Sequence, residues 1–222
     1  VINCSFMLNL PDHSALDENL ERMTVSIREI FERLGTQQKL VMVAAAGNEG
    51  HILRPRPPTL YPAAFRNVFG VGALKNARPG FNGIYQAAAY SNWADDQNSD
   101  EGYMTLGGEG GAEQGILGLY IGEFPTLSFF WRIWDDFFGW LFGPSSHAHV
   151  KYRRNTTAWA WWTGTSFSAA ILSGILAALP SQPGNRRSLD SFRNAQIALD
   201  RITQPSSSGQ VEKVISAEQL PP

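Results

Sequence analysis

The sequence predicts an α/β fold in which a mostly parallel sheet lies between two layers of helices, a helix-sheet-helix arrangement. Three continuous apolar runs, at residues 1–8, 40–48 and 67–74, are typical of strands that are covered on both faces. Segments with helical periodicity alternate with these runs, which favours parallel strands joined by right-handed crossovers. In such a fold the functional site lies at the carboxyl ends of the strands.

The first half of the chain provides three predicted strands and one helix. The run VINCSFML has the length of a strand, and residues 15–34 follow it with apolar side chains at helical spacing. The next run, LVMVAAAGN, stops at a Gly-Asn corner, so Asn48 lies at the carboxyl end of its strand. The run NVFGVGAL comes after a Pro-rich loop and predicts the third strand. The apolar residues of the predicted helix are Leu16, Leu20, Met23, Ile27, Ile30, Phe31 and Leu34.

The second half of the chain provides two more helices. Residues 165–179 are apolar on nearly every side, which predicts a helix buried in the middle of the domain. Residues 188–202 have the pattern of an ordinary amphipathic helix. The stretch QPSSSGQ after Ile202 is typical of a turn or linker. We therefore expect residues 1–204 to belong to the domain and residues 205–222 to form a tail.

The composition fits one globular domain and excludes some partners. With 222 residues, 43% of them hydrophobic, the chain can bury a sizeable core. A net charge of −2 does not provide the clustered basic charge that nucleic acid requires, so no nucleic-acid partner is expected. No apolar run reaches the roughly 20 residues of a membrane-spanning helix. The single cysteine, Cys4, excludes an internal disulfide, leaves the compartment undetermined, and is expected to be an inert apolar thiol.

A Gly-Thr-Ser corner precedes the predicted buried helix, in the sequence WWTGTSFSAA. This corner places Ser166 at a helix N-terminus, where unpaired backbone N–H groups favour developing negative charge. Two interpretations are open from this stretch alone. Ser166 is a nucleophile, or it is an N-cap, because Ser and Thr are common capping residues; Thr165 can supply the cap instead.

Three motifs, VMVAAAGNEG, YPAAFRNVFGVGAL and GTSFSAA, occur in this order along the chain. Together they resemble the carboxyl-side part of a subtilisin-like serine peptidase, and VINCSF resembles the substrate-lining strand of that family. The resemblance covers residues 1–180. It implies a subtilisin-like α/β fold and a serine endopeptidase that acts on polypeptide.

The resemblance also implies catalytic roles. Ser166 would form the acyl-enzyme, and its backbone N–H together with the side-chain amide of Asn48 would stabilise the oxyanion. Gly47 would let the chain approach the substrate closely, and Gly164 and Thr165 would shape the corner. From the residues alone, Asn48 also fits a turn residue that follows a strand.

The substrate side departs from the resembled pattern. Ser5 and Phe6 match the family's substrate-lining strand, but Met7 stands where the family has a glycine. The Met7 side chain would narrow the pocket and favour small substrate side chains. A register shifted by one residue would instead turn each side chain of this strand to the opposite face.

The base of a catalytic triad is missing from the expected place. The family's order is Asp, His, Ser, with Asp-[Ser/Thr]-Gly and His-Gly-Thr motifs. Neither motif occurs in this chain, so we expect the Asp and His upstream of Val1 and a domain that is incomplete on its N-terminal side. The alternative is a catalytically inactive subtilisin-like module with a binding or structural role. The histidines that fail to match are His13, His51, His147 and His149.

No metal or other cofactor is expected. His147 and His149 form a lone His-x-His pair without cysteine or carboxylate partners, which is typical of a solvated loop. The resembled family commonly binds calcium, but the chain has no Asp-x-Asp pattern to hold it.

An aromatic-rich insertion is expected at about residues 120–155. Within it, residues 127–142 place apolar and aromatic side chains at i, i+3, i+4 and i+7 steps, which predicts an amphipathic helix. This helix would cover the core of its own domain, dock a partner or the missing N-terminal part of the domain, or lie on a membrane. Its acidic polar face argues against a membrane. The compartment is unknown, and only the family resemblance favours a secreted protein.

Overall fold

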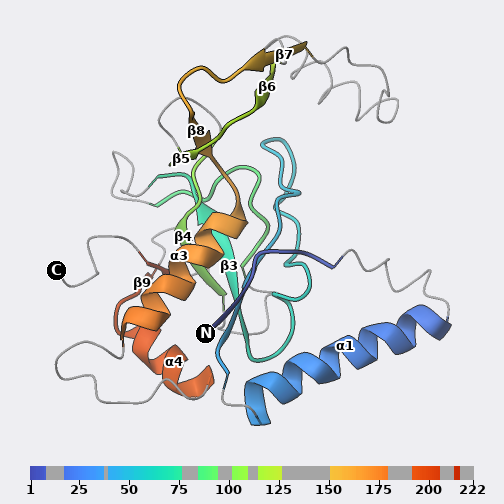
Figure 1. Ribbon diagram of the computed structural model, residues 1–222. Coiled ribbons are helices and arrows are strands. Elements are labelled where there is room, and N and C mark those ends of the chain that lie inside the picture. The colour runs from blue at the N-terminus through green and yellow to red at the C-terminus, as the bar shows by residue number, and fades with distance from the viewer. Residues whose placement is uncertain are drawn as a thin grey trace. The chain divides into compact units, whose positions relative to one another are not determined.

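The computed structural model describes residues 1–8, 18–37, 40–76, 85–94, 102–109, 115–126, 151–179, 192–205 and 213–215 (Figure 1). The chain divides into two compact units. One consists of residues 1–116 and 161–222, and the other of residues 117–160.

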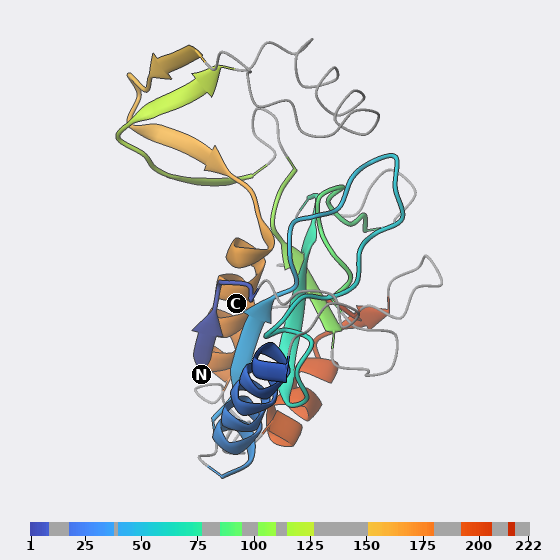
Figure 2. The same cartoon turned by 90° about the vertical axis from the view of Figure 1, so that its right-hand side faces the viewer.

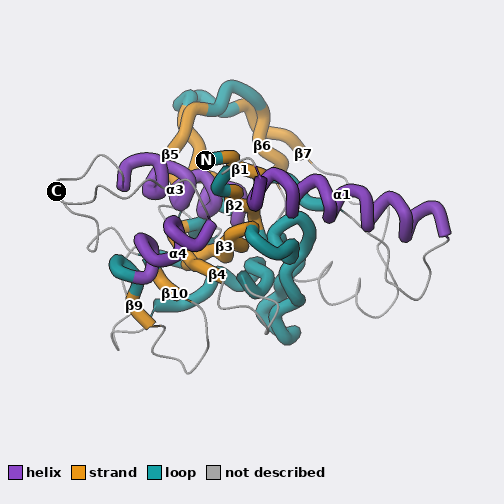
Figure 3. Tube along the Cα trace, turned by 90° about the horizontal axis from the view of Figure 1, so that it is seen from below, coloured by secondary structure: helices purple, strands orange, loops and turns teal. Residues whose placement is uncertain are grey.

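A six-stranded sheet forms the centre of the first unit (Figure 3). Its order is β1-β2-β3-β4-β10-β9, and every pair is parallel except β10 with β9. The predicted mostly parallel sheet is therefore confirmed. The strands are β1 (Ile2–Cys4), β2 (Met42–Ala45), β3 (Val68–Leu74), β4 (Gly102–Leu106), β9 (Gln204–Pro205) and β10 (Lys213–Val214).

Each face of the sheet packs against helices. Side chains alternate between the two faces of a strand, so Val43 and Phe69 pack on one face with helices α3 (Thr165–Ala178) and α4 (Phe192–Asp200). Met42 and Val68 pack on the other face, against helix α1 (Glu18–Gln37). Figure 2 shows α1 and α3 on opposite sides of the strands. The three-layer arrangement is confirmed, and burial on both faces explains why the strand sequences are continuously apolar.

Helix α3 is the central helix that its sequence predicts. It contacts strands β1, β2, β3 and β4, and its side chains Leu172 and Leu176 are fully buried. Helix α4 packs beside it, with the ring of Phe192 stacked on that of Phe69 at 4.1 Å between centroids. Because α3 crosses the middle of the sheet, its N-terminus is fixed relative to the strand ends.

Helix α1 begins at residue 18 and ends at residue 37, against the predicted 15–34. Ile27, Phe31 and Leu34 pack against the sheet as predicted. Ile30 does not, because its side chain is 56% exposed at the margin of that stripe.

The carboxyl-terminal segment is not only a tail. Lys213–Val214 form β10, which pairs in parallel with β4, and Val214 and Ile215 are buried. Lys213 Nζ also donates to Asp200 Oδ1 at 2.9 Å, which ties this strand to the end of α4. A strand of two residues is too short to produce a periodic pattern, so the prediction of a tail over residues 205–222 was wrong for this part.

In the described part of the second unit, residues 117–126 and 151–160, short strands pair with one another. Strand β6 (Glu123–Thr126) pairs antiparallel with β7 (Lys151–Arg154). Strand β5 (Ile116–Leu119) pairs with β8 (Trp159–Trp162), which leads back to the first unit. The aromatic stripe predicted at residues 127–142 lies outside the described residues, as do His147 and His149.

The substitution Leu176→Ala should lower the free energy of unfolding by about 2–5 kcal/mol, because it leaves a cavity where a fully buried side chain packs between α3 and the sheet. Urea denaturation of the full chain measures the loss.

Gly174→Ala in the same helix is the matched control. Gly174 is exposed and an added Cβ would meet nothing within 4 Å, so alanine should raise the unfolding free energy by about 0.5–1 kcal/mol. Equal effects of the two substitutions would contradict the central position of α3.

Candidate active site

Asn48 lies in the loop that leaves the carboxyl end of β2. Gly47, just before it, has φ 120°, a conformation that side chains other than glycine rarely adopt. A Cβ there would also lie 2.6 Å from Glu49 Oε2 and 2.7 Å from Asn92 Nδ2. Only glycine therefore allows the sharp turn that brings Asn48, whose side chain is exposed, out of the sheet.

The Gly164-Thr165-Ser166 corner forms the start of α3. Gly164 is the N-cap residue, and no side chain caps the helix. Ser166 is thus the second residue of the helix, and its Oγ lies 3.5 Å from the carbonyl oxygen of Ser5. The interpretation of Ser166 or Thr165 as the N-cap was therefore wrong, because the backbone of Gly164 occupies that position.

Asn48 and this corner are joined directly. Thr165 donates to Asn48 Oδ1 from its backbone nitrogen at 2.9 Å and from its hydroxyl at 3.0 Å. The Thr165 hydroxyl in turn accepts a hydrogen bond from the Gly47 nitrogen at 3.3 Å. Because the N–H of Thr165 must face an acceptor, the planar amide of Asn48 turns its Nδ2 away from Thr165. Two segments 117 residues apart therefore meet at one edge of the sheet.

Ser5 lies against Ser166. The Ser5 hydroxyl donates to the Ser166 carbonyl oxygen at 3.1 Å and accepts a hydrogen bond from Asn3 Nδ2 at 2.9 Å. Beyond Ser5, the side chains of Phe6 and Met7 are 50% and 44% exposed. Phe6 and Met7, which follow Ser5 in the segment predicted to line a substrate, thus have accessible side chains close in sequence to the contact with Ser166.

Tyr90 supports the corner from behind. Its hydroxyl donates to the carbonyl oxygens of Gly107 and Gly108 at 2.9 and 2.8 Å, and the Gly107 oxygen also accepts from the Gly164 nitrogen at 3.1 Å. A Cβ on Gly107 would lie 2.4 Å from Ala73 Cβ, so the turn packs directly on β3. Tyr90 therefore fixes the Gly107 carbonyl, which accepts the hydrogen bond from the Gly164 nitrogen.

The environment of Tyr90 keeps its hydroxyl protonated. Burial raises the pKa of Tyr90 far above its ordinary value, a hydrogen bond with the Gly164 backbone lowers it in part, and the nearby carboxylate of Glu109 adds a smaller increase. Glu109 itself is held by Lys75, whose Nζ lies 2.6 Å from Oε2, and by the backbone nitrogen of Ala89 at 3.2 Å from Oε1.

Sequence reasoning missed Tyr90 and Asn92, which stand on either side of Ser91 in one loop. Both lie outside the periodic segments, and their only signal was a polar Ser-Asn pair after an apolar stretch. Asn92 is fully buried beside Gly47.

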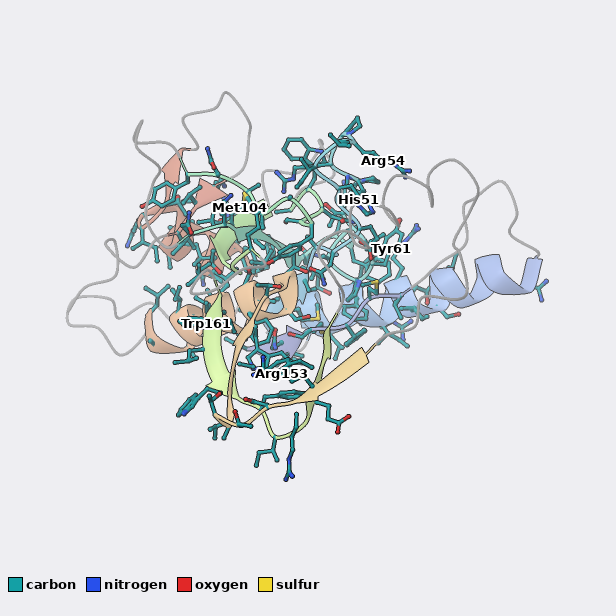
Figure 4. The ribbon with its side chains drawn as sticks, turned by 90° about the horizontal axis from the view of Figure 1, so that it is seen from above. His51, Arg54, Tyr61, Met104, Arg153 and Trp161 are labelled. Atoms are coloured by element: carbon teal, nitrogen blue, oxygen red, sulfur yellow. The ribbon has the colours of Figure 1, made fainter. Side chains whose placement is uncertain are left out.

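The described residues contain no group of three or more metal-binding side chains. His51 lies on an exposed turn with Arg54, whose nitrogen donates to the His51 carbonyl at 3.1 Å (Figure 4). Burial raises the pKa of the Cys4 thiol, which favours the unreactive protonated form. Among the described residues, no helix is both long and apolar enough to cross a membrane.

A three-layer α/β fold with the GNEG and GTS motifs at one edge of its sheet is that of a subtilisin-like serine peptidase. The model of the subtilase family, peptidase S8, matches residues 1–198, and the chain belongs to this family. A search of the curated proteins gives no match.

The solved structures that are similar to this chain include two maturation or lanthipeptide proteases. The prenylagaramide maturation protease PagA is 18% identical to this chain, with a TM-score of 0.50. The alignment covers 98% of this chain and 59% of the PagA chain. A lanthipeptide protease is 15% identical to this chain, with a TM-score of 0.53. The alignment covers 92% of this chain and 56% of the protease chain. At these identities the likeness shows the fold, and the present chain corresponds to little more than half of each solved chain.

Tyr90→Phe should flatten the loss of stability at alkaline pH. Since the pKa of Tyr90 is higher in the folded state, its contribution to the unfolding free energy is complete below about pH 10 and declines as the pH rises above that value. Urea denaturation of both proteins at pH 8 and pH 11 measures the decline. An equal decline in the variant would contradict this role of the phenol.

Proposed function

We propose that this chain is the nucleophile-bearing part of a serine endopeptidase. Ser166 Oγ would attack the carbonyl carbon of a peptide bond, and the Ser166 N–H and Asn48 Nδ2 would stabilise the oxyanion. The observation that carries the proposal is the pair of hydrogen bonds between Asn48 and Thr165, which places an amide donor next to the residue before the serine.

The backbone at the start of α3 supports the same proposal. The Thr165 nitrogen donates to Asn48 and the Phe167 nitrogen donates to Gly164. Among the described residues, the Ser166 nitrogen between them has no hydrogen-bond acceptor. An unpaired N–H at a helix N-terminus favours nearby negative charge, so this donor is suited to an oxyanion.

The two donors would act in the transition state. Attack by the hydroxyl converts the carbonyl oxygen into an oxyanion, and donors already in place stabilise it without reorganisation. One such side-chain donor contributes about 3–4 kcal/mol in enzymes of this chemistry. Because Thr165 fixes Asn48 Oδ1, the Asn48 amide is already oriented when negative charge develops on the substrate oxygen.

The general base would come from polypeptide outside these 222 residues. The Asp-[Ser/Thr]-Gly and His-Gly-Thr motifs are absent from the sequence. Among the described residues, the side-chain hydrogen bond of Ser166 goes to the carbonyl oxygen of Ser5, which cannot accept its proton as a base. A histidine and aspartate supplied by another segment would complete the triad, and a peptide would lie along Ser5 and Phe6.

The 222-residue chain alone should therefore be nearly inert. With no base, the oxyanion donors would leave a residual acceleration of about 10³ to 10⁴ over water. Hydrolysis of a fluorogenic peptide by the purified chain, with Ser166→Ala as the control, measures this residual activity. Ordinary peptidase turnover by the chain alone would contradict an external base.

Asn48→Ala should lower kcat by about 10² to 10³ with little change in KM, in a polypeptide that includes the histidine and aspartate. Asn155→Ala is the matched control, since the Asn155 side chain binds backbone groups of the second unit, and it should preserve kcat.

The kinetic split also separates the alternatives. A raised KM with preserved kcat would make Asn48 a turn residue. Absence of peptide hydrolysis by the complete polypeptide would favour the inactive module with a binding or structural role.

A further inference from the structure

Asn92 is a fully buried polar residue beside the Asn48 loop, and the chemistry proposed above does not use it. It lies in the connection between β3 and β4, 44 positions after Asn48 in the chain. A buried amide is costly unless it is hydrogen-bonded, so its partners indicate what holds it there.

The partners of Asn92 lie on both sides of Asn48. The Asn92 backbone nitrogen donates to the carbonyl oxygen of Gly47 at 3.1 Å. The Glu49 nitrogen donates to Asn92 Oδ1 at 2.9 Å. One residue thus binds the neighbour before Asn48 through its backbone and the neighbour after it through its side chain.

Asn92 is itself held in place. Its Nδ2 donates to the carbonyl oxygen of Pro58 at 2.9 Å, and its own carbonyl accepts from Arg56 Nη2 at 2.6 Å. The Arg56 guanidinium also lies 4.2 Å from the centre of the Trp93 ring, a cation–π contact. The side chain therefore cannot turn without breaking bonds at both ends of its amide.

We propose that Asn92 is a positioning residue for the oxyanion donor, holding the backbone on both sides of Asn48 so that the Asn48 amide points at the reacting carbonyl. The inference rests on the proposed function of Asn48. Thr165 fixes the amide end of the Asn48 side chain, and Asn92 fixes the backbone on both sides of Asn48. Together these contacts leave the Asn48 amide one orientation.

This arrangement suits an exposed donor. Asn48 is an exposed loop residue, and its side chain would otherwise sample several orientations. Donors that are preorganised stabilise the transition state without ordering at the moment of reaction. Displacement of such a donor by about 1 Å can cost on the order of 10²-fold in rate.

Amide hydrogen exchange tests the contact in the full-length protein. The Glu49 amide should be protected in the wild type although Glu49 is an exposed residue, and Asn92→Ala should accelerate its exchange at least about tenfold. Thr59→Val is the matched control: it removes a partly buried hydrogen bond of 2.6 Å to the Trp93 carbonyl, which joins the same pair of segments without involving Asn48 or Glu49, and should leave Glu49 exchange unchanged.

Two exchange results would overturn the positioning role. One is rapid exchange of Glu49 in the wild type, which requires no variant and therefore decides the point even where Asn92→Ala fails to fold. The other is equal acceleration by Asn92→Ala and Thr59→Val, which would show a general loosening of the loop.

Kinetics of the same polypeptide test the consequence. Asn92→Ala should lower kcat by about 10- to 10²-fold with KM preserved, and Asn48→Ala/Asn92→Ala should be no slower than Asn48→Ala, because Asn92 acts through Asn48. Additive losses in the double variant would overturn the positioning role. A kcat unaffected by Asn48→Ala would instead overturn the proposed function, while Glu49 exchange still reports on the contact.

Discussion

The hydrogen bonds from Thr165 to Asn48 are the interaction on which the rest of the site depends. Together with the hydrogen bond from the Gly47 nitrogen to the Thr165 hydroxyl, they connect the loop after β2 to the N-terminus of α3. In a parallel sheet the strands end at a common edge, and a helix that crosses the sheet presents its first turn there. A single side chain can therefore span the gap, because packing between α3 and the sheet has already set its width.

That packing was largely predictable, because long apolar segments carry a strong signal. Residues 40–48 and 67–74 are apolar on both faces of a strand, and α3 is apolar on nearly every side, so burial was implied by the sequence itself. Strand β10 was not predictable, since its two residues gain their place by pairing with β4 and β9. Its stability is tertiary, and no local pattern records it.

The motifs of the candidate site could be predicted from the sequence, but the residues that hold these motifs in place could not. Asn48 directly follows Gly47, and Ser166 lies two residues after Gly164; the motifs indicate the unusual backbone conformations of both glycines. Tyr90 and Asn92 act through hydrogen bonds to backbone carbonyls and amides of distant segments, and such bonds are insensitive to the partner's side chain. A sequence cannot show which carbonyl a tyrosine reaches. The cap at Gly164 was missed for the same reason, because it is made by backbone alone.

The contrast between Gly107 and Met7 has an evolutionary consequence. A side chain at position 107 would collide with β3 and with the Ser168 hydroxyl of α3, at 2.4 and 2.6 Å, so selection for folding forbids change there. The exposed side chains of Phe6 and Met7 meet no such constraint, although Ser5 beside them contacts Ser166. Mutation can thus change the segment beside Ser166 without disturbing the core. A lineage with this architecture is free to vary this segment while inheriting its scaffold unaltered.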